Sequence, residues 1–421
     1  MVHILDELAW RGLLAQTTDE RALREALDAG PVTLYCGFDP TAPSLHHGHL
    51  VQLVVLRHLQ LAGHRVLALV GGATGLIGDP RMSGERVLNT KDTVAEWVTR
   101  LQTQVSRFLD FEGENAARMV NNLEWTGDLT AIDFLREVGK HYRLGTMLAK
   151  DTVARRLASD EGLSFTEFSY QILQGMDFLE LYRRHGCTLQ TGGNDQWGNL
   201  LSGVELVRKS DQGSVHALTT PLITKADGTK FGKSEGGAIW LAPDMMTPYA
   251  FYQFWLNTDD ADVVRYLKIF TFRTREEIAE LEESVRARPA AREGQRALAR
   301  DVTTLVHGAE ATDAVVAASQ ALFGRGDLAS LDVDTLEAAF AELPRTTLDL
   351  DAPELVDLLV ATGLVGGRSA ARRAIGEGGI SINNVRVESE DAVVSPGQLL
   401  HGRWALLRRG KRTLAVAEWR P

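Results

Sequence analysis

The sequence has few cysteines, no long apolar run and no leader-like start. Two cysteines among 421 residues, Cys36 and Cys187, exclude a disulfide framework and a four-cysteine zinc site. No run of about 18 apolar residues occurs, so no membrane span is expected. The opening MVHILDEL has no basic stretch before an apolar one, so no secretory leader is expected. These absences predict a cytoplasmic protein, and the low cysteine content fits a reducing compartment.

Positive charge is scarce in most of the chain but not at its end. The formal net charge is −11, which argues against a protein covered in positive charge for nucleic acid. Residues 366–421 nevertheless hold ten Arg or Lys and five Asp or Glu, a net of +5 that leaves −16 for the other 365 residues. Two interpretations fit this excess: a solvated surface, or a module that places cations on RNA phosphates.

Alternating strand and helix patterns predict an α/β fold. Residues 32–36 (VTLYC) and 65–70 (RVLALV) are apolar runs typical of buried strands, and a turn-rich loop and an apolar helix pattern separate them. Strand, helix and strand of these lengths form a βαβ unit, and continuous apolar strands suit a parallel sheet covered on both faces. Such a Rossmann-like sheet binds ligands at the carboxyl ends of its strands.

The first candidate phosphate site is HHGH, residues 46–49, which follows the first strand and opens the apolar helix pattern. A helix start offers free N–H groups and the positive end of the helix dipole to phosphate. His46 and His49 can donate hydrogen bonds to phosphate oxygens, and Gly48 lets a nucleotide lie close to the backbone. Zinc binding is the weaker alternative, because no further ligand cluster is visible.

The second candidate phosphate site is KADGTKFGKS, residues 225–234, a glycine-containing loop. Lys230 and Lys233, three residues apart, can place ammonium groups on a polyphosphate when such a loop closes over it. The loop is not a Walker motif, because the order G-x-x-x-x-G-K-[ST] is absent. On its own it would more readily be a basic surface hairpin.

Together the two motifs resemble the HIGH and KMSKS motifs of class I aminoacyl-tRNA synthetases. Longer blocks narrow the resemblance to the bacterial-type tyrosyl-tRNA synthetases, in that family's order over nearly the whole chain. The blocks are YCGFDPTAPSLHHGH (35–49), ALVGGATGLIGDP (68–80), FTEFSYQILQGMDF (165–178), LQTGGNDQWGN (189–199), PLITKADGTKFGKS (221–234) and FYQFWLNTDD (251–260). The resemblance implies a ligase that activates L-tyrosine with ATP and transfers it to the 3′ end of tRNA(Tyr).

The resemblance also implies roles for the residues that match the family's motifs. Those at tyrosine would be Tyr35 and Asp177 on the phenol, Asp79, Tyr170 and Gln174 on the α-ammonium group, and Gln196 near the carboxylate. Those at ATP would be Cys36, Asp195 and His49 on the ribose, Thr41 and His46 at the γ-phosphate, and Lys230 and Lys233 on the leaving pyrophosphate, with Gly37, Asp39 and Gly48 close by. Mg²⁺ would arrive with ATP, and no protein-bound structural metal is expected. Taken singly, a strand tyrosine is more often a core residue, and an aspartate can be a helix cap.

The loop after Asp79 departs from the family pattern. Relatives commonly carry a lysine within the next few residues, on a phosphate-contacting loop, but residues 81–86 here read RMSGER. Arg81 or Arg86 would have to supply that charge. Arginine and lysine are not equivalent donors, so this contact stays open.

The resemblance implies a domain order and two kinds of partner. Residues 1–225 would form the catalytic domain with a helical insertion at about 86–165, and residues 226–325 the KFGKS loop and an α-helical domain on the anticodon side. A linker over 326–352 would lead to a small α+β RNA-binding domain over 353–421. The tRNA contacts would be Arg368, Arg372, Arg373, Arg408, Arg409, Lys411 and Arg412. A homodimer is expected, with its contact in the insertion and at Phe165.

Three alternatives remain at this point. A tryptophanyl-tRNA synthetase shares the fold, but the set Tyr35, Tyr170, Gln174 and Asp177 disfavours it. A synthetase-derived RNA-binding protein without charging activity would release no pyrophosphate with tyrosine, and the intact HHGH and KFGKS motifs disfavour it. A nucleotidyltransferase for a small acid also uses H-x-G-H, but it would not need the cationic C-terminal residues.

Overall fold

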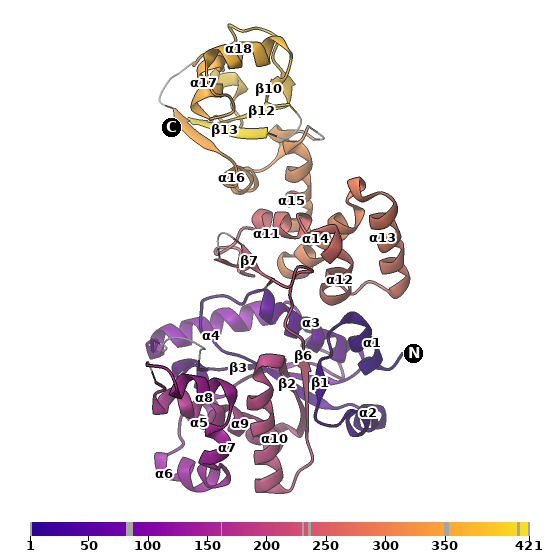
Figure 1. Cartoon of the computed structure of the whole chain (residues 1–421), viewed down its shortest axis with the longest axis vertical. Coiled ribbons are helices and arrows are strands. Elements are labelled where there is room, and N and C mark those ends of the chain that lie inside the picture. Colours follow the sequence, from indigo (N-terminus) through magenta and orange to yellow (C-terminus); the bar gives the residue numbers. More distant parts are fainter. Residues whose placement is uncertain are drawn as a thin grey trace. The chain divides into compact units, whose positions relative to one another are not determined.

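The computed structural model describes residues 2–80, 87–160, 162–229, 231–234, 237–324, 326–348, 353–410 and 413–419. The chain packs as two compact units, residues 1–245 with 258–298 and residues 246–257 with 299–421. Figure 1 gives the element labels that are used below. Within the described ranges, no helix is both long and apolar enough to cross a membrane.

The first unit contains, in its described residues, a six-stranded sheet with the order β1-β6-β5-β2-β3-β4 (Figure 1). Neighbouring strands run parallel except the edge pair of β1 and β6. This arrangement confirms the predicted α/β class with a Rossmann-like parallel sheet. The strands are β1 Gln16–Thr17, β2 Thr33–Phe38, β3 Arg65–Val70, β4 Arg118–Asn121, β5 Cys187–Gly193 and β6 His216–Thr220.

Helices of the first unit pack against this sheet and are joined to its strands by loops. Helix α9 begins where the Ser164 side chain accepts the Glu167 N–H and ends at Gly186 in a left-handed conformation. The longer helices of this unit, among its described residues, are α1 Ile4–Arg11, α2 Glu20–Ala29, α3 His47–Leu61, α4 Lys91–Val105, α9 Phe165–His185, α10 Trp197–Asp211, α12 Asp260–Phe270 and α13 Arg275–Ala287. Helix α14, Glu293–His307, has residues in both units.

The segment predicted as a helical insertion is mostly helical, but it also contributes a strand. Its short helices are α5 Leu123–Thr126, α6 Ala131–Asp133, α7 Leu144–Leu148 and α8 Asp151–Leu157. Strand β4 lies inside the predicted insertion and pairs in parallel with β3. Its sequence signal is weak because, of its four residues, only Val120 is buried.

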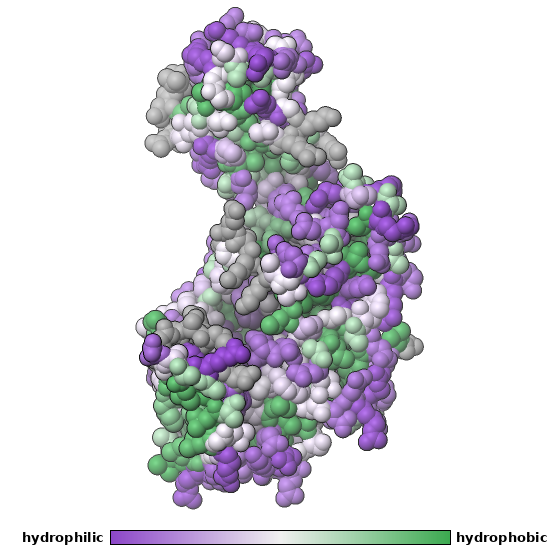
Figure 2. Space-filling model, viewed as in Figure 1, coloured by the Kyte–Doolittle hydropathy of each residue, from purple (hydrophilic) through white to green (hydrophobic). Residues whose placement is uncertain are grey.

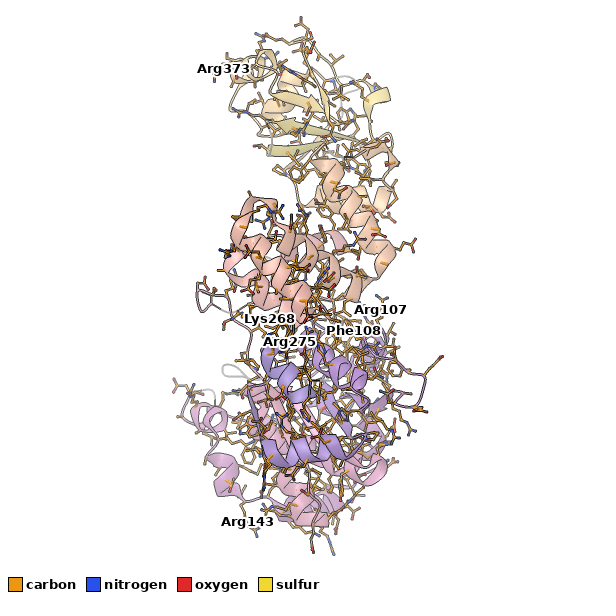
Figure 3. The ribbon with its side chains drawn as sticks, turned by 90° about the vertical axis from the view of Figure 1, so that its right-hand side faces the viewer. Arg107, Phe108, Arg143, Lys268, Arg275 and Arg373 are labelled. Carbon is orange, nitrogen blue, oxygen red and sulfur yellow. The ribbon has the colours of Figure 1, made fainter. Side chains whose placement is uncertain are left out.

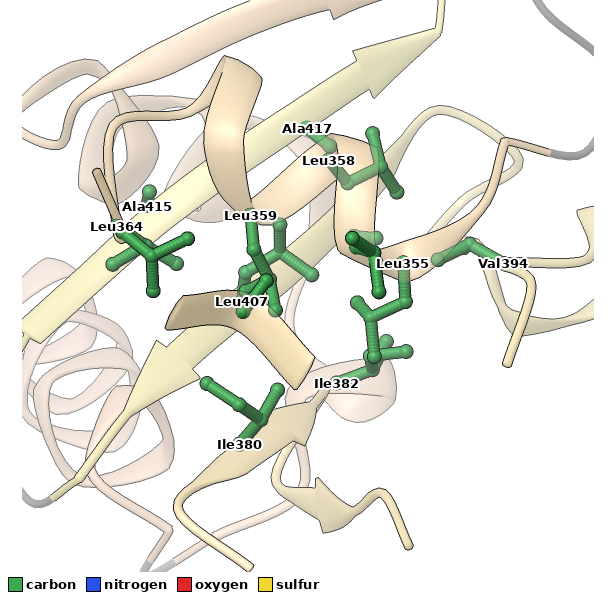
Figure 4. Close-up of a cluster of buried hydrophobic side chains, with 14 of the residues drawn as sticks. Leu355, Leu358, Leu359, Leu364, Ile380, Ile382, Val394, Leu407, Ala415 and Ala417 are labelled. Carbon is green, nitrogen blue, oxygen red and sulfur yellow. The ribbon is translucent and has the colours of Figure 1, made fainter. Parts of the chain in front are cut away.

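The second unit contains, within the ranges described, a five-stranded sheet with the order β11-β10-β12-β13-β9. Helices α17 and α18 cover it through a cluster of buried apolar side chains that includes Leu359, Ile380 and Leu407 (Figure 4). The elements are α11 Pro248–Leu256, α15 Ala309–Leu322, α16 Val333–Ala341, β9 Arg345–Leu348, α17 Leu355–Ala361, α18 Arg368–Gly376, β10 Ile380–Ile382, β11 Val385–Arg386, β12 Trp404–Arg409 and β13 Thr413–Trp419.

The segment predicted as a linker, 326–352, is structured where it is described. It holds α16 and strand β9, which pairs in parallel with β13. An ion pair between Arg345 and Glu418 at 2.6 Å joins these two strands. The pattern was hard to read because β9 buries none of its four side chains completely. The predicted domain boundaries as a whole stay predictions.

Candidate active site

Two histidines cap the helix that follows β2. Helix α3 begins at His47, and His46 precedes it as the N-cap in an extended conformation. The Nδ1 atom of His46 accepts a hydrogen bond from the Gly48 N–H at 3.0 Å, and Nδ1 of His49 accepts one from the His46 N–H at 3.1 Å. This reciprocal cap satisfies N–H groups that the first helical turn leaves free. Because Nδ1 accepts in both rings, Nε2 carries the proton and can donate to a ligand.

Gly48 keeps the space beside the first imidazole open. A Cβ atom on residue 48 would lie 2.9 Å from Cε1 of His46, which is too close for a real side chain. Any larger residue would therefore push the His46 ring out of its capping position.

The three imidazoles at the head of α3 are neutral at pH 7. Burial lowers the pKa of His46, lowers that of His47 to about 4, and holds the pKa of His49 well below its usual value. The rings of His46 and His49 lie only 4.0 Å apart, so positive charge on both is unfavourable without an anion nearby. Neutral N–H donors suit a site where negative charge grows on phosphate during the reaction.

The segment of the second motif contacts the same helix start. Lys230 lies outside the described residues, and only the backbone of Lys233, in the short strand β7 Lys233–Ser234, is described. Between them, the Phe231 ring lies 5.3 Å from the ring of His47. After β8 Gly237–Ala238, the carbonyl of Ile239 accepts the His47 N–H at 2.9 Å. The structure therefore brings Phe231 of the second motif, and Ile239 after it, to the HHGH helix start.

A buried carboxylate on α9 and a buried phenol on the interior strand β2 form another candidate site. Asp177, on α9, is 2% exposed and accepts hydrogen bonds from Asn122 Nδ2 at 3.0 Å and Trp125 Nε1 at 2.9 Å. Tyr35, on β2, packs edge-on against Phe178 at 5.3 Å. The Tyr35 hydroxyl is buried and has no hydrogen-bond partner among the described residues. Such an unpaired group is costly, which indicates that a ligand group belongs there.

Burial shifts the pKa of both groups upward. Burial raises the pKa of Asp177 to about 7, and the donors Asn122 and Trp125 act against that rise. Burial, followed by the charge of Asp177, holds the pKa of Tyr35 well above its usual value. A carboxylate with two donors already in place is arranged to accept a third from a ligand hydroxyl.

Asp79 belongs to a second polar cluster. It accepts hydrogen bonds from Gln196 Nε2 at 2.9 Å and from Asn199 Nδ2 at 3.2 Å. Lys150 reaches Asn199 Oδ1 at 3.4 Å. Burial lowers the pKa of Lys150 to about 8, while the charge of Asp79 acts in the opposite direction. The structure thus places Asp79 and Gln196 together, as the sequence led us to expect, and adds two residues that the sequence analysis did not identify.

Tyr170 and Gln174 lie one helical turn apart on α9. The Tyr170 hydroxyl donates to Asp39 Oδ2 at 2.6 Å, and Thr74 Oγ1 donates to Asp39 Oδ1 at 2.7 Å. The Oε1 atom of Gln174 is buried and has no partner within the described part of the chain. Asp39, expected at ATP, therefore joins the C-terminal end of β2 to α9, and Gln174 keeps an acceptor for a ligand.

The other residues expected at ATP divide into buried and exposed ones. Cys36 is buried on β2, with its Sγ 3.8 Å from Gln52 Oε1, and burial raises the pKa of its thiol to about 12. The thiol is therefore a neutral donor at pH 7. Gly37 is exposed within β2, near its carboxyl end, and Thr41 and Asp195 are exposed after β2 and β5.

The cations expected at tRNA lie in the second unit. Arg372 and Arg373 are exposed on α18, and Arg373 projects outward from that helix (Figure 3). Arg368, on the same helix, is already bound to Asp357 at 2.6 Å and to Glu354 at 2.8 Å. It is therefore less available to phosphate than Arg373, while Arg372 has a longer ion pair with Glu390 at 4.0 Å.

The remaining expected cations contact the protein itself or fall outside the described residues. Arg408 Nε donates to Ser381 Oγ at 3.1 Å, and Arg409 Nη1 donates to the Leu364 carbonyl at 2.8 Å. Lys411 and Arg412, which were expected at tRNA, lie outside the described residues. Arg81 and Arg86, in the loop after Asp79, also lie outside them.

Four site residues were missed by the sequence analysis. They are Asn122, Trp125, Lys150 and Asn199. The sequence around each of these residues does not predict its partner, because each contact depends on the tertiary fold. Among the described residues, no group of three or more His, Cys, Asp or Glu side chains is placed to hold a metal ion.

The fold and the two joined motifs define a class I aminoacyl-tRNA synthetase. Residues 27–324 match the family model described as "tRNA synthetases class I (W and Y)". Residues 335–417 match the model described as "Tyrosine--tRNA ligase SYY-like C-terminal domain". A tryptophanyl-tRNA synthetase from Encephalitozoon cuniculi shares the fold with a TM-score of 0.53 at 13% identity, over 79% of this chain and 89% of that one.

Relatives over the full length make the assignment specific. A tyrosine–tRNA ligase of Streptomyces griseus is 63% identical over 422 residues, covering 100% of both chains. One of Mycobacterium tuberculosis is 58% identical and covers 99% of this chain and 98% of its own. A truncated mitochondrial tyrosyl-tRNA synthetase from Aspergillus nidulans is 31% identical with a TM-score of 0.70, over 77% of this chain and 95% of that one. The chain belongs to the tyrosine–tRNA ligase family.

Proposed function

We propose that the chain activates L-tyrosine with ATP, releases pyrophosphate, and transfers the tyrosine to the 3′ end of tRNA(Tyr) in the cytoplasm. One observation carries this proposal: a histidine-capped helix start in contact with Phe231 of the second motif occurs in one unit with a buried carboxylate and a buried phenol. The helix start and the second motif suit a chain of phosphates, and the two buried groups suit a phenol.

The phenol of tyrosine is recognised by Asp177 and Tyr35. The substrate hydroxyl donates to the Asp177 carboxylate and accepts from the Tyr35 hydroxyl, which has no other partner in the part of the chain that the structure describes. Phenylalanine would leave both groups unpaired. Tyrosyl-tRNA synthetases are themselves the known example of this effect, with a discrimination of about 10⁵ and no editing site. Tryptophan has no hydroxyl at this end and is disfavoured for the same reason.

The other end of tyrosine is held by polar groups of α9 and the adjacent loops. Asp79, Tyr170 and Gln174 surround the α-ammonium group, and the buried Gln174 Oε1 supplies an acceptor that has no partner in the described structure. Gln196, whose amide donates to Asp79 at 2.9 Å, is the proposed partner of the substrate carboxylate. This arrangement orients the carboxylate toward the head of α3.

Adenylate formation needs positioning and charge stabilisation more than acid–base chemistry. The tyrosine carboxylate is already a nucleophile, and it attacks the α-phosphorus of the magnesium complex of ATP while the bond to pyrophosphate breaks. His46 and Thr41 bind the γ-phosphate end, and His49, Cys36 and Asp195 bind the ribose, with Gly37, Asp39 and Gly48 close by. Lys230 and Lys233 neutralise the charge that grows on the leaving pyrophosphate.

Transfer to tRNA uses the second unit. The terminal ribose hydroxyl of tRNA attacks the adenylate carbonyl, and AMP leaves. Arg372 and Arg373, exposed on α18, bind tRNA phosphates, together with other cations of the C-terminal fold. The net charge of +5 over residues 366–421 supports this assignment.

The helical segment after β4 is the contact of a homodimer. Large apolar side chains are exposed there, and Figure 2 shows them gathered over this segment. They are Leu123, Ile132, Leu135, Leu144, Leu148, Leu157 and Phe165, the last with 75% of its surface exposed. An exposed apolar cluster of this size is typical of a protein–protein contact, and a symmetric dimer would bury it.

Tyrosine-dependent ATP–pyrophosphate exchange, followed by charging of bulk tRNA, tests the proposal. We expect exchange with tyrosine, at least 10³-fold less with tryptophan or phenylalanine, and loss of tyrosine exchange in Asp177→Ala. Exchange with tryptophan at the tyrosine rate would identify the other member of the class. Binding of RNA without any exchange would identify a protein that has lost charging activity.

A further inference from the structure

We infer that His47, the middle histidine of HHGH, is a positioning residue that fixes the KFGKS segment against the head of α3. Its ring meets the ring of Phe231 edge-on, with centroids 5.3 Å apart and planes at 86°. The His47 imidazole also hydrogen-bonds to the backbone of Phe231. Two different interactions, one apolar and one polar, thus join the two motifs through one side chain.

Phe231 is held on its other side as well. It is 6% exposed, and its ring packs against those of Tyr266 at 4.6 Å and Phe270 at 5.7 Å, both on α12. Phe231 therefore occupies a fixed socket between α3 and α12, and His47 forms the α3 wall of that socket.

The next residue, Gly232, shows that the imidazole sets the backbone path. Its φ angle of +80° is one that side-chain-bearing residues rarely adopt. A Cβ atom there would lie 2.1 Å from both Cε1 and Nε2 of His47. The ring of His47 thus fills the space that a side chain at position 232 would need.

The hydrogen-bonding state of His47 separates it from the two capping histidines. Its Nδ1 atom is buried and has no partner among the described residues, so Nε2 is the atom that bonds to the Phe231 backbone. Its Nε2 proton is therefore used within the protein, whereas His46 and His49 accept through Nδ1 and keep Nε2 for a ligand. His47 acts on phosphate only through the segment that it holds.

The contact has a consequence for the proposed reaction, on which this inference rests. Phe231 and Gly232 stand between Lys230 and Lys233 in the chain. Holding these two residues against His47 restricts the positions that the two ammonium groups can reach. The HHGH motif differs from HIGH at His47, and the KFGKS motif differs from KMSKS at Phe231 and Gly232. These three residues contact one another.

Kinetics of adenylate formation test the inference. His47→Leu keeps the volume but removes the hydrogen bond, and we expect the KM for ATP to rise about five- to tenfold, with an unchanged Kd for tyrosine. His47→Gln, which restores an N–H near the position of Nε2, should recover part of the loss. His185→Leu, the same change at the end of α9, is the matched control and should leave both constants unchanged. Equal weakening of tyrosine and ATP binding in His47→Leu would overturn the inference.

A combination of substitutions tests the contact directly. Gly232→Ala should raise the KM for ATP far more in the natural chain than in a His47→Ala background. In the His47→Ala background the new Cβ no longer clashes with the imidazole, and only the backbone strain at residue 232 remains. Equal effects in the two backgrounds would contradict the contact.

Limited trypsin digestion gives a readout that does not depend on activity. If the two proteins have the same melting temperature, cleavage after the lysines of residues 225–233 should be faster in His47→Ala than in the unmodified protein. Unchanged cleavage would contradict the inference. If the unmodified protein gave no tyrosine-dependent exchange, the proposed function would fail while this digestion result still decided the contact.

Discussion

Replacing Asp177 by asparagine should have opposite effects on activity and on pH-dependent stability. The carboxylate accepts from Asn122 at 3.0 Å and from Trp125 at 2.9 Å, and the substrate phenol is the third donor. A carboxamide has one acceptor oxygen and turns an NH₂ group toward at least one of these donors. Losing a hydrogen bond to a charged group and leaving one donor unpaired together amount to about 3–4 kcal/mol. We therefore expect kcat/KM for tyrosine to fall about 10²- to 10³-fold.

The stability effect follows from the pKa of the same carboxyl. Burial raises the pKa of Asp177 to about 7 from an ordinary 3.8, so the folded protein binds the extra proton between about pH 4 and 7. The free energy of unfolding therefore falls as pH rises through this window, by an amount on the order of 4 kcal/mol, and the loss is complete above pH 7. The asparagine variant lacks this titration.

Two assays decide this prediction. Pyrophosphate exchange at varied tyrosine gives kcat/KM, and thermal unfolding at pH 5 and pH 8 gives the difference in melting temperature between variant and parent. That difference should shift in favour of Asp177→Asn on going from pH 5 to pH 8, and the exposed Asp128→Asn should show no such shift. Near-normal kcat/KM, or a melting difference that does not change with pH, would refute the reasoning.

Three further substitutions test the tyrosine site, the dimer contact and the tRNA contact separately. Trp125→Phe removes one donor to Asp177 and should lower kcat/KM for tyrosine about tenfold in the exchange assay; an unchanged value would exclude that role. Phe165→Asp places a charge in the exposed apolar cluster and should raise the dimer dissociation constant at least tenfold by sedimentation; an unchanged dimer would place the contact elsewhere. Arg373→Glu should raise the KM for tRNA and lower its salt dependence, with normal exchange, and a loss of exchange would contradict a purely RNA-binding role.

Buried parallel strands were the part of the fold most open to prediction. The predicted strand at 65–70 coincides with β3, because every side chain after Arg65 is buried and leaves an unbroken apolar run. Strand β2 begins one residue later than predicted and continues to Phe38, since its pairing with β3 extends through Gly37. A glycine at a strand end gives no pattern that marks this continuation.

Edge strands were not predictable from their own residues. Strand β4 buries only Val120, and β9 buries no side chain fully. Each belongs to a sheet because a neighbouring strand offers a free edge, and that is a property of the assembled fold. Local apolar pattern therefore points to helix or linker at both places.

The residues of the candidate site also fall into those that the sequence predicted and those that it did not. Motif residues such as His46 and Asp177 could be predicted because they lie in long blocks that resemble a known family. Asn122 and Trp125 could not, since they stand 55 and 52 residues from their partner Asp177, and nothing near them in the sequence indicates a buried carboxylate. The role of His47 likewise depends on a ring far along the chain.

We propose that HHGH and KFGKS bind one phosphate chain together. Single-turnover formation of tyrosyl-adenylate, measured for His46→Ala, Lys233→Ala and the double variant, tests it most directly. We expect each single change to slow the step at least tenfold, and the double variant to be faster than the product of the two losses, because both groups act on the same leaving pyrophosphate. Strictly multiplicative losses would show that the two motifs act on separate charges and would contradict the account.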